Sequence, residues 1–138
     1  MKKYLVFLFA SMILNSCDQA GDEIVGSWER INDDKSGMVV TVTKEKDVYI
    51  GRISFLTDSN KIDGFELGDV KWKGIEYVEN DNYKFQDLWK GLDLNGQIES
   101  IGYGEGYIEI QNDKIIIKHT KDNKTGLMQE WKRTILLQ

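Results

Sequence analysis

The stretch Tyr107-Ile108-Glu109-Ile110-Gln111-Asn112-Asp113-Lys114-Ile115-Ile116-Ile117-Lys118 decides the fold class of this chain. Apolar and polar residues alternate on both sides of Asn112-Asp113, a dipeptide suited to a two-residue hairpin turn. If the chain folds back at this turn, one buried face is formed by Ile108, Ile110, Ile115 and Ile117. The stretch therefore predicts a pair of antiparallel strands.

The same pattern extends outward from this hairpin to most of the chain. From Ile24 onward, short apolar alternations are separated by polar turns, and no segment has the length and periodicity of a convincing helix. The expected strands are residues 24–31, 37–45, 47–57, 69–78, 82–90, 97–103, 106–111, 114–120 and 127–136. A spacing of about ten residues with turn signals between strands is typical of antiparallel sandwiches and barrels. We predict a single all-β domain over residues 24–138, in which the register of 58–68 and 91–104 is not fixed by the pattern.

Two short motifs at the ends of this domain favour a barrel. Gly26-Ser27-Trp28 opens the first expected strand, and Trp131-Lys132-Arg133 lies on the last one. This combination resembles the lipocalin and calycin superfamily, which implies an antiparallel up-and-down β-barrel of about eight or nine strands. In that resemblance Gly26, Trp28 and Arg133 close one end of the barrel, with the arginine lying across the indole. A guanidinium can stack on an indole and still donate to nearby carbonyls.

A closer resemblance covers residues from Gly26 to Arg133. The segment Asp33-Asp34-Lys35-Ser36-Gly37, then Tyr49-Ile50-Gly51-Arg52-Ile53, and the closing Trp131-Lys132-Arg133 are similar to a family of short exported bacterial proteins with lipocalin-like barrels. The family's middle tryptophan and tyrosine strands correspond to Trp72-Lys73-Gly74-Ile75 and Tyr83-Lys84-Phe85. Its central proline-containing turn is missing here. The family has no assigned activity, so the resemblance implies a fold and leaves the function open.

The first seventeen residues predict a lipid anchor. Met1-Lys2-Lys3 is positively charged, Tyr4 to Leu14 is apolar, and Leu14-Asn15-Ser16-Cys17 resembles the bacterial lipobox. The apolar run is shorter than the roughly 20 residues that a membrane-spanning helix needs. We therefore expect residues 1–16 to be removed as a lipoprotein signal peptide and Cys17 to be acylated. Cys17 is the only cysteine, so no disulfide is expected.

Composition and charge narrow the location and the partners. Residues 17–23 are small and acidic and form the expected tether. Removing residues 1–16 takes away two lysines and no acids, so the net charge of −5 becomes more negative by two. The absence of a basic cluster argues against nucleic acid as a partner. The predicted location is the bacterial cell envelope, with the outer membrane favoured over the inner one. The acidic tether also resembles that of some surface-exposed lipoproteins.

Candidate catalytic and metal sites are sparse. His119 is the only histidine, and without a second histidine or a cysteine nucleophile we interpret it as a partly exposed residue at a strand end. The segments Asn32–Gly37 and Asp93–Gly96 contain oxygen ligands but lack the complete pattern of a calcium loop, so they are interpreted as turns. Gly102-Tyr103-Gly104-Glu105-Gly106 is interpreted as a site of bends or bulges. We expect no enzyme activity, no cofactor and no metal.

Aromatic residues are the remaining candidates for a binding site. Those that could line a cavity are Trp72, Tyr83, Phe85, Trp89, Tyr103 and Tyr107, although they could equally fill the core of a small barrel. We therefore expect an envelope lipoprotein whose barrel binds a small apolar or amphipathic ligand. The alternative is a solid-cored barrel that serves as a protein-interaction or inhibitor module for an envelope partner.

Overall fold

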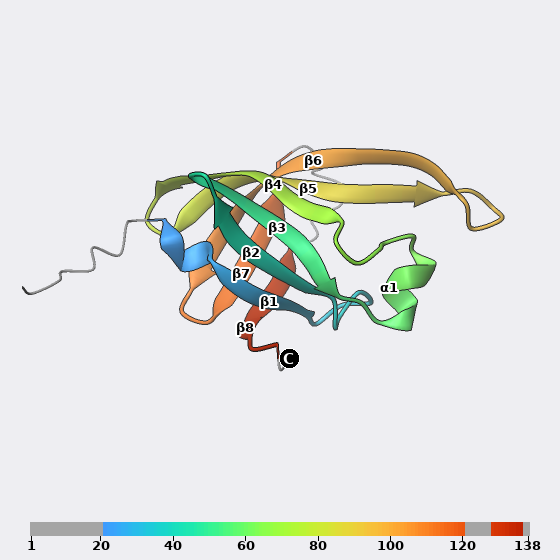
Figure 1. Cartoon of the computed structure of the whole chain (residues 1–138), viewed down its shortest axis with the longest axis horizontal. Helices are drawn as coiled ribbons and strands as arrows, with labels where there is room; N and C mark the ends of the chain where they lie inside the picture. Colours follow the sequence, from blue (N-terminus) through green and yellow to red (C-terminus); the bar gives the residue numbers. More distant parts are fainter. Residues whose placement is uncertain (1–20, 121–127, 137–138) are drawn as a thin grey trace, which may run out of the picture.

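Eight antiparallel strands close into one barrel in a computed structural model that describes residues 21–120 and 128–136 (Figure 1). The strands are β1 (Gly26–Ile31), β2 (Val39–Glu45), β3 (Val48–Phe55), β4 (Val70–Glu79), β5 (Asn82–Leu92), β6 (Ile98–Gln111), β7 (Lys114–His119) and β8 (Gln129–Thr134). Each strand pairs with the next, and β8 pairs with β1. The predicted all-β, up-and-down barrel is confirmed. The expected signal peptide, residues 1–16, and Cys17 lie outside the described residues.

Tight turns join the strands at one end of the barrel. Both residues of Lys46-Asp47 and both residues of Asn80-Asp81 have positive φ angles. This is the conformation of a two-residue hairpin turn whose twist matches that of the strands. Asn112 also has a positive φ, of 58°. The hairpin predicted around Asn112 is confirmed, because Ile108 pairs with Ile117 and Ile110 pairs with Ile115.

The expected division of residues 97–111 into two strands is wrong. β6 runs without interruption from Ile98 to Gln111, and its register against β5 is continuous from Ser100 to Glu109. The glycines of this segment therefore do not form bulges. At Gly106 a Cβ atom would lie 2.7 Å from the Lys118 carbonyl oxygen and 2.9 Å from the Phe85 ring. Gly106 thus allows a close approach inside a regular strand.

Two short helical segments accompany the strands. A 3₁₀ turn, η1 (Asp22–Ile24), precedes β1, and a short helix, α1 (Asp58–Ile62), follows β3. Thr57 and Asn60 form a reciprocal capping box at the start of α1. A helix of five residues is too short to give a periodic signal in the sequence. None of the helices in the described part of the chain is long and apolar enough to span a membrane.

The core fills the part of the barrel that lies toward the tight turns. Its largest fully buried side chains are Trp28, Trp72, Tyr83 and Trp131. Trp72 meets Trp131 edge to face with 4.8 Å between ring centroids, and it meets Phe85 in the same way at 6.2 Å. Beyond the other end, the β5–β6 hairpin projects past the barrel on the side where α1 lies (Figure 1).

Candidate functional site

The end of the barrel that bears the tight turns is closed. The Arg133 guanidinium lies 4.2 Å from the centre of the Trp28 ring, and it donates to the carbonyl oxygens of Val25 at 3.1 Å and Glu23 at 2.8 Å. The Trp28 indole donates to the Ile24 carbonyl at 2.9 Å. A Cβ on Gly26, whose φ is 132°, would lie 2.8 Å from an Arg133 terminal nitrogen. Gly26, Trp28 and Arg133 therefore form one closing unit with η1.

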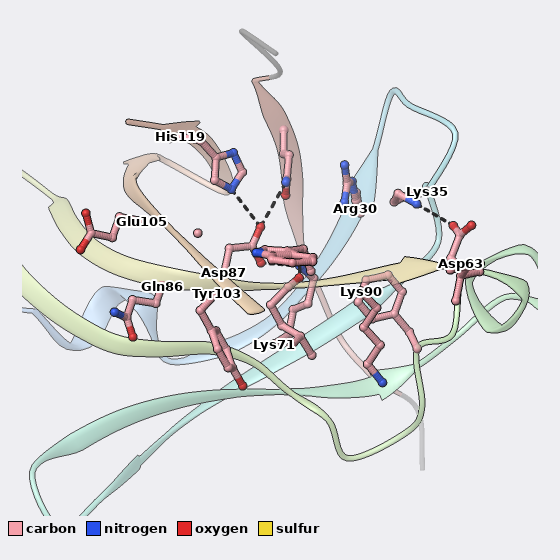
Figure 2. A pocket seen from close by; sticks show the side chains of 16 residues that line it. Arg30, Lys35, Asp63, Lys71, Gln86, Asp87, Lys90, Tyr103, Glu105 and His119 are labelled. Carbon is pink, nitrogen blue, oxygen red and sulfur yellow. Dashed lines mark hydrogen bonds and ion pairs between the residues drawn. The ribbon is translucent and has the colours of Figure 1, made fainter. Parts of the chain in front are cut away.

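The opposite end opens into a cavity of about 620 Å³, which Figure 2 shows from close by. This volume lies within the range of about 300–1,000 Å³ that is usual for small-molecule sites. The walls come from the ends of β1, β4, β7 and β8, from the second half of β5, from the middle of β6, and from the loops that carry Lys35 and Phe65. Large apolar side chains thus fill the barrel toward the closed end, and the described residues leave a hollow toward the open end.

A layer of polar side chains forms the floor of this cavity. Five strands each contribute one inward-facing residue to it, and the five are Arg30, Lys71, Asp87, His119 and Gln129. Side chains on a strand alternate between its two faces, so residues i and i+2 point the same way. Several residues of the layer therefore lie two positions after a buried aromatic or aliphatic residue. Arg30 thus follows Trp28, and Asp87 follows Phe85. We call these five residues the polar layer.

Asp87 is the centre of the polar layer. Its side chain is 5% exposed and pairs through Oδ1 with the Lys71 ammonium, which also donates to the Leu88 carbonyl oxygen at 2.7 Å. Oδ2 lies 3.1 Å from His119 Nε2 and accepts a bond from Gln129 Nε2 at 3.2 Å. In Figure 2, the dashed line from His119 meets a second dashed line at the Asp87 carboxylate. Both carboxylate oxygens are therefore engaged by protein donors.

Charges within the layer shift the pKa values of Asp87 and Lys71. Burial by itself would raise the pKa of Asp87, but the Lys71 charge and the His119 hydrogen bond outweigh it and hold that pKa below its ordinary value. Burial lowers the pKa of Lys71, Asp87 opposes this change, and the positive charges of Arg30 and Lys35 add to it. Asp87 is therefore ionised at neutral pH and serves as the internal counter-ion of the layer.

Other cations surround the rim of the cavity, each with its own carboxylate. Lys35 Nζ lies 2.6 Å from Asp63, and Lys90 Nζ lies 2.7 Å from Asp69 and donates to the Gly64 carbonyl oxygen at 2.9 Å. The Phe65 ring lies among Lys35, Lys71 and Lys90, at 5.4 to 6.0 Å from each ammonium. These contacts fix the loop between α1 and β4 across the open end.

The remaining wall of the cavity is largely apolar. Leu88, Trp89 and Leu92 lie on β5, and Phe65 lies on the α1–β4 loop. Tyr103 lines the cavity from β6 and donates to the Val70 carbonyl oxygen at 2.8 Å. Burial, followed by the charge of Asp69, raises the pKa of Tyr103, which keeps its hydroxyl protonated as a donor. The cavity thus combines a charged floor with an apolar side.

The predicted ligand-lining aromatics divide into three groups. Trp89 and Tyr103 line the cavity, and Trp89 is 47% exposed. Trp72, Tyr83 and Phe85 are instead packed in the core and do not line this cavity. Tyr107 lies at an outward position of β6 and borders a separate hollow with Gly74 and Lys84, so it does not line the cavity either. The core needs large apolar side chains, which the sequence pattern could not distinguish from cavity-lining ones.

His119 ends β7, where the sequence placed it, and is 24% exposed. The sequence did not predict that it faces Asp87 within a cavity. A carboxylate-oriented imidazole can accept or donate a proton, yet the described lining residues include no serine, threonine or cysteine that could act as its nucleophile. The expectation that the protein is not an enzyme stays a prediction.

The segments considered for calcium form ordinary turns in the structure. Asp33 Oδ1 accepts from the Lys35 backbone N–H at 3.0 Å, and Asp93 Oδ1 accepts from those of Asn95 at 2.8 Å and Gln97 at 2.9 Å. These are the local backbone bonds expected of Asp in turns. Within residues 21–120 and 128–136, no group of three or more acidic, histidine or cysteine side chains is arranged to hold a metal ion.

Comparison with known proteins identifies no relative of this chain. The chain matches no protein-family model, no curated protein and no solved structure. The resemblance to lipocalin-like exported proteins therefore stays a prediction.

Proposed function

We propose that this protein is a lipid-anchored envelope barrel that binds a small amphipathic molecule in its open end. The cavity of about 620 Å³ is the single observation that carries this proposal. Its apolar wall can bury a hydrocarbon or ring system, and a few convergent polar groups are what ligand pockets use to fix orientation. The anchor at Cys17 and the envelope location rest on the sequence of the first seventeen residues.

A cavity-filling variant tests the binding function. Gly104 lines the cavity, and a Cβ added there would meet only His119 Cδ2, at 3.9 Å. Gly104→Leu should therefore extend an isobutyl group into the cavity without displacing backbone. The matched control is Thr43→Leu, which adds a leucine at an exposed position of β2.

The measurement is titration of each folded protein with a neutral fluorescent amphiphile such as N-phenyl-1-naphthylamine. Wild-type protein and Thr43→Leu should enhance the fluorescence equally, whereas Gly104→Leu should weaken binding about tenfold or more, since a filled pocket loses apolar burial. Equal binding by all three proteins would place the probe elsewhere and argue against the cavity as the site. Native mass spectrometry of protein from its own cells would then identify a retained molecule.

The projecting β5–β6 hairpin favours protein interaction as a second candidate function. Leu94, Ile98 and Ile101 are exposed on this hairpin, which projects beyond the barrel (Figure 1). Exposed apolar side chains on one projecting element are typical of interaction surfaces. Crosslinking in intact cells should capture one recurrent envelope protein with wild-type chain but not with Ile98→Ser/Ile101→Ser. Capture that is the same for both proteins would remove the support for this role.

A further inference from the structure

The polar layer contains more buried positive charge than buried negative charge. Arg30 and Lys71 have side chains that are only 9% and 3% exposed, while Asp87 is the one carboxylate of comparable burial among the described lining residues. The carboxylate that pairs with Arg30 is Asp33, which is 27% exposed and does not line the cavity. The Arg30–Asp33 pair is therefore oriented with its cation toward the cavity.

Arg30 keeps hydrogen-bonding capacity on the cavity side. Its Nε donates to Asp33 Oδ2 at 2.7 Å, and its terminal amino groups have no acceptor among the residues that the structure describes. The guanidinium lies 5.7 Å from the centre of the Trp131 ring, and Figure 2 shows it between the Asp87 cluster and Lys35. The planar fork of arginine matches the two oxygens of a carboxylate or phosphate.

Asp87 leaves little capacity for a cationic ligand. Its two oxygens already accept from Lys71, His119 and Gln129, which leaves one of the roughly four lone-pair sites of the carboxylate for a further donor. The charges of Arg30 and Lys35 act against that of Lys71, after the larger effect of burial. An added anion would reduce this repulsion, whereas an added cation would increase it.

We propose that the cavity selects amphiphiles with an oxyanion head group, and that Arg30 is the residue that recognises this head group. The carboxylate or phosphate accepts from the terminal amino groups of Arg30, with Lys71 and Lys35 contributing positive potential. The apolar part of the ligand lies against Leu88, Trp89 and Leu92. This inference rests on the proposed binding function and specifies its ligand class.

A head-group series tests the proposal on the unmodified protein. The probes are dodecanoate, dodecyl phosphate, dodecanol and dodecyltrimethylammonium, which share one alkyl chain. Calorimetric titration gives each Kd, below the micelle concentration of the three charged probes and below the solubility limit of dodecanol. We expect one or both anions to bind about tenfold or more tightly than dodecanol, because a hydrogen bond to a charged group contributes about 1.5–3 kcal/mol. The two anions distinguish a carboxylate from a phosphate site.

Substitution of Arg30 tests the assigned residue. Arg30→Gln should weaken the preferred anion about tenfold or more and leave dodecanol within about twofold, since only the charge-assisted bonds are lost. Arg30→Lys keeps the positive charge but lacks the planar fork, so its affinity for the anion should lie between those of wild type and Arg30→Gln. It also provides a second variant if Arg30→Gln does not fold. The matched control is Arg52→Gln, which removes a guanidinium that is about half exposed on β3 and does not line the cavity.

The outcomes separate this inference from the proposed function. If dodecanol or the ammonium amphiphile binds as tightly as both anions, the oxyanion selectivity is wrong while the binding function stands. An anion preference that is unchanged in Arg30→Gln and Arg30→Lys would disprove the role of Arg30. If none of the four amphiphiles binds, the proposed function itself loses its support.

Discussion

At the scale of single residues, Asp87 joins three strands through its side chain. It connects Lys71 of β4, His119 of β7 and Gln129 of β8, and of these four residues only His119 is not buried. Removing one partner of a buried ion pair leaves the other charge uncompensated, which costs more than the net contribution of the intact pair. The polar layer is therefore expected to be sensitive to substitution even though it lies beside a cavity.

Asp87→Asn should destabilise the protein by about 3 kcal/mol at neutral pH, because the buried Lys71 charge loses its counter-ion. The measurement is urea unfolding followed by tryptophan fluorescence. Asp34→Asn, at an exposed position without side-chain partners in the described structure, is the control and should change stability by no more than about 0.5 kcal/mol. A loss below about 1 kcal/mol for Asp87→Asn would contradict the counter-ion role.

The pH dependence of stability should also depend on Asp87. The folded-state pKa of Asp87 lies below its ordinary value of 3.8, so the unfolded chain takes up this proton first as the pH falls. The stabilisation from Asp87 is therefore present above about pH 4 and is lost as the pH falls through the folded-state pKa. Unfolding measured from about pH 5 to pH 2 should show a shallower loss of stability in Asp87→Asn than in wild type. Identical slopes would mean that other carboxylates cause the acid sensitivity.

Arg133 provides a second residue-scale prediction, at the closed end. Arg133→Gln loses the stacking on Trp28 and the bonds to the Val25 and Glu23 carbonyl oxygens. Because the guanidinium is partly exposed, we expect a destabilisation of about 1–2 kcal/mol. Thermal unfolding measures it, with Arg52→Gln as the exposed arginine control. Equal melting temperatures for the two variants would show that Arg133 does not stabilise the closure.

At the scale of elements, two glycines of β6 give a matched comparison. At Gly106 an added methyl would clash with the Lys118 carbonyl oxygen and Phe85, whereas at Gly104 it would make one ordinary contact, with His119. Gly106→Ala should therefore destabilise by about 1–3 kcal/mol, while Gly104→Ala should be neutral or slightly stabilising, by up to about 1 kcal/mol. Urea midpoints measure both. A larger loss in Gly104→Ala than in Gly106→Ala would contradict the assigned packing of β6 against β7.

The elements also show which structure the sequence could predict. The β6–β7 hairpin was predictable because its alternation and its turn dipeptide are both local signals. The continuity of β6 was not predictable, because Gly102, Gly104 and Gly106 suggest an interrupted strand. Gly106 is needed for close contact with neighbouring strands, which the local sequence does not show. α1 is stabilised by its Thr57–Asn60 capping box and is too short for periodicity to detect.

The polar layer could have been found only in part. Every second residue of a strand points into the barrel. Arg30 is the next inward residue after Trp28, and Asp87 is the next one after Phe85. Charged residues at strand ends are, however, usually solvated, and nothing local distinguishes these two from outward-facing ones. Their convergence depends on closure of the barrel, which also brings Asp87 into a hydrogen bond with Gln129, 42 positions away.

At the scale of the whole molecule, the lipid anchor is the feature that sequence alone supports. We expect the mature protein to begin at an acylated Cys17 and to fractionate with membranes, and Cys17→Ala to be released into the soluble envelope fraction. Acyl chains contribute about 0.8 kcal/mol per buried CH₂, so the difference between the two proteins should be nearly complete. Intact-mass measurement together with fractionation tests this. An unmodified thiol, or cleavage at another residue, would contradict the anchor.

Gly21 lies at the closed end, where its carbonyl oxygen accepts from the Tyr83 hydroxyl at 2.8 Å. Four Cα-to-Cα steps separate it from Cys17, a reach of at most about 14 Å. With an anchor at Cys17, the closed end is therefore the membrane-proximal pole, and the cavity opens toward the aqueous compartment. A ligand would then enter and leave the cavity through water or from a surface opposite the cavity mouth. It would not transfer laterally from the leaflet that holds the anchor. Such an arrangement suits a tethered receiver of molecules that arrive from outside its own membrane.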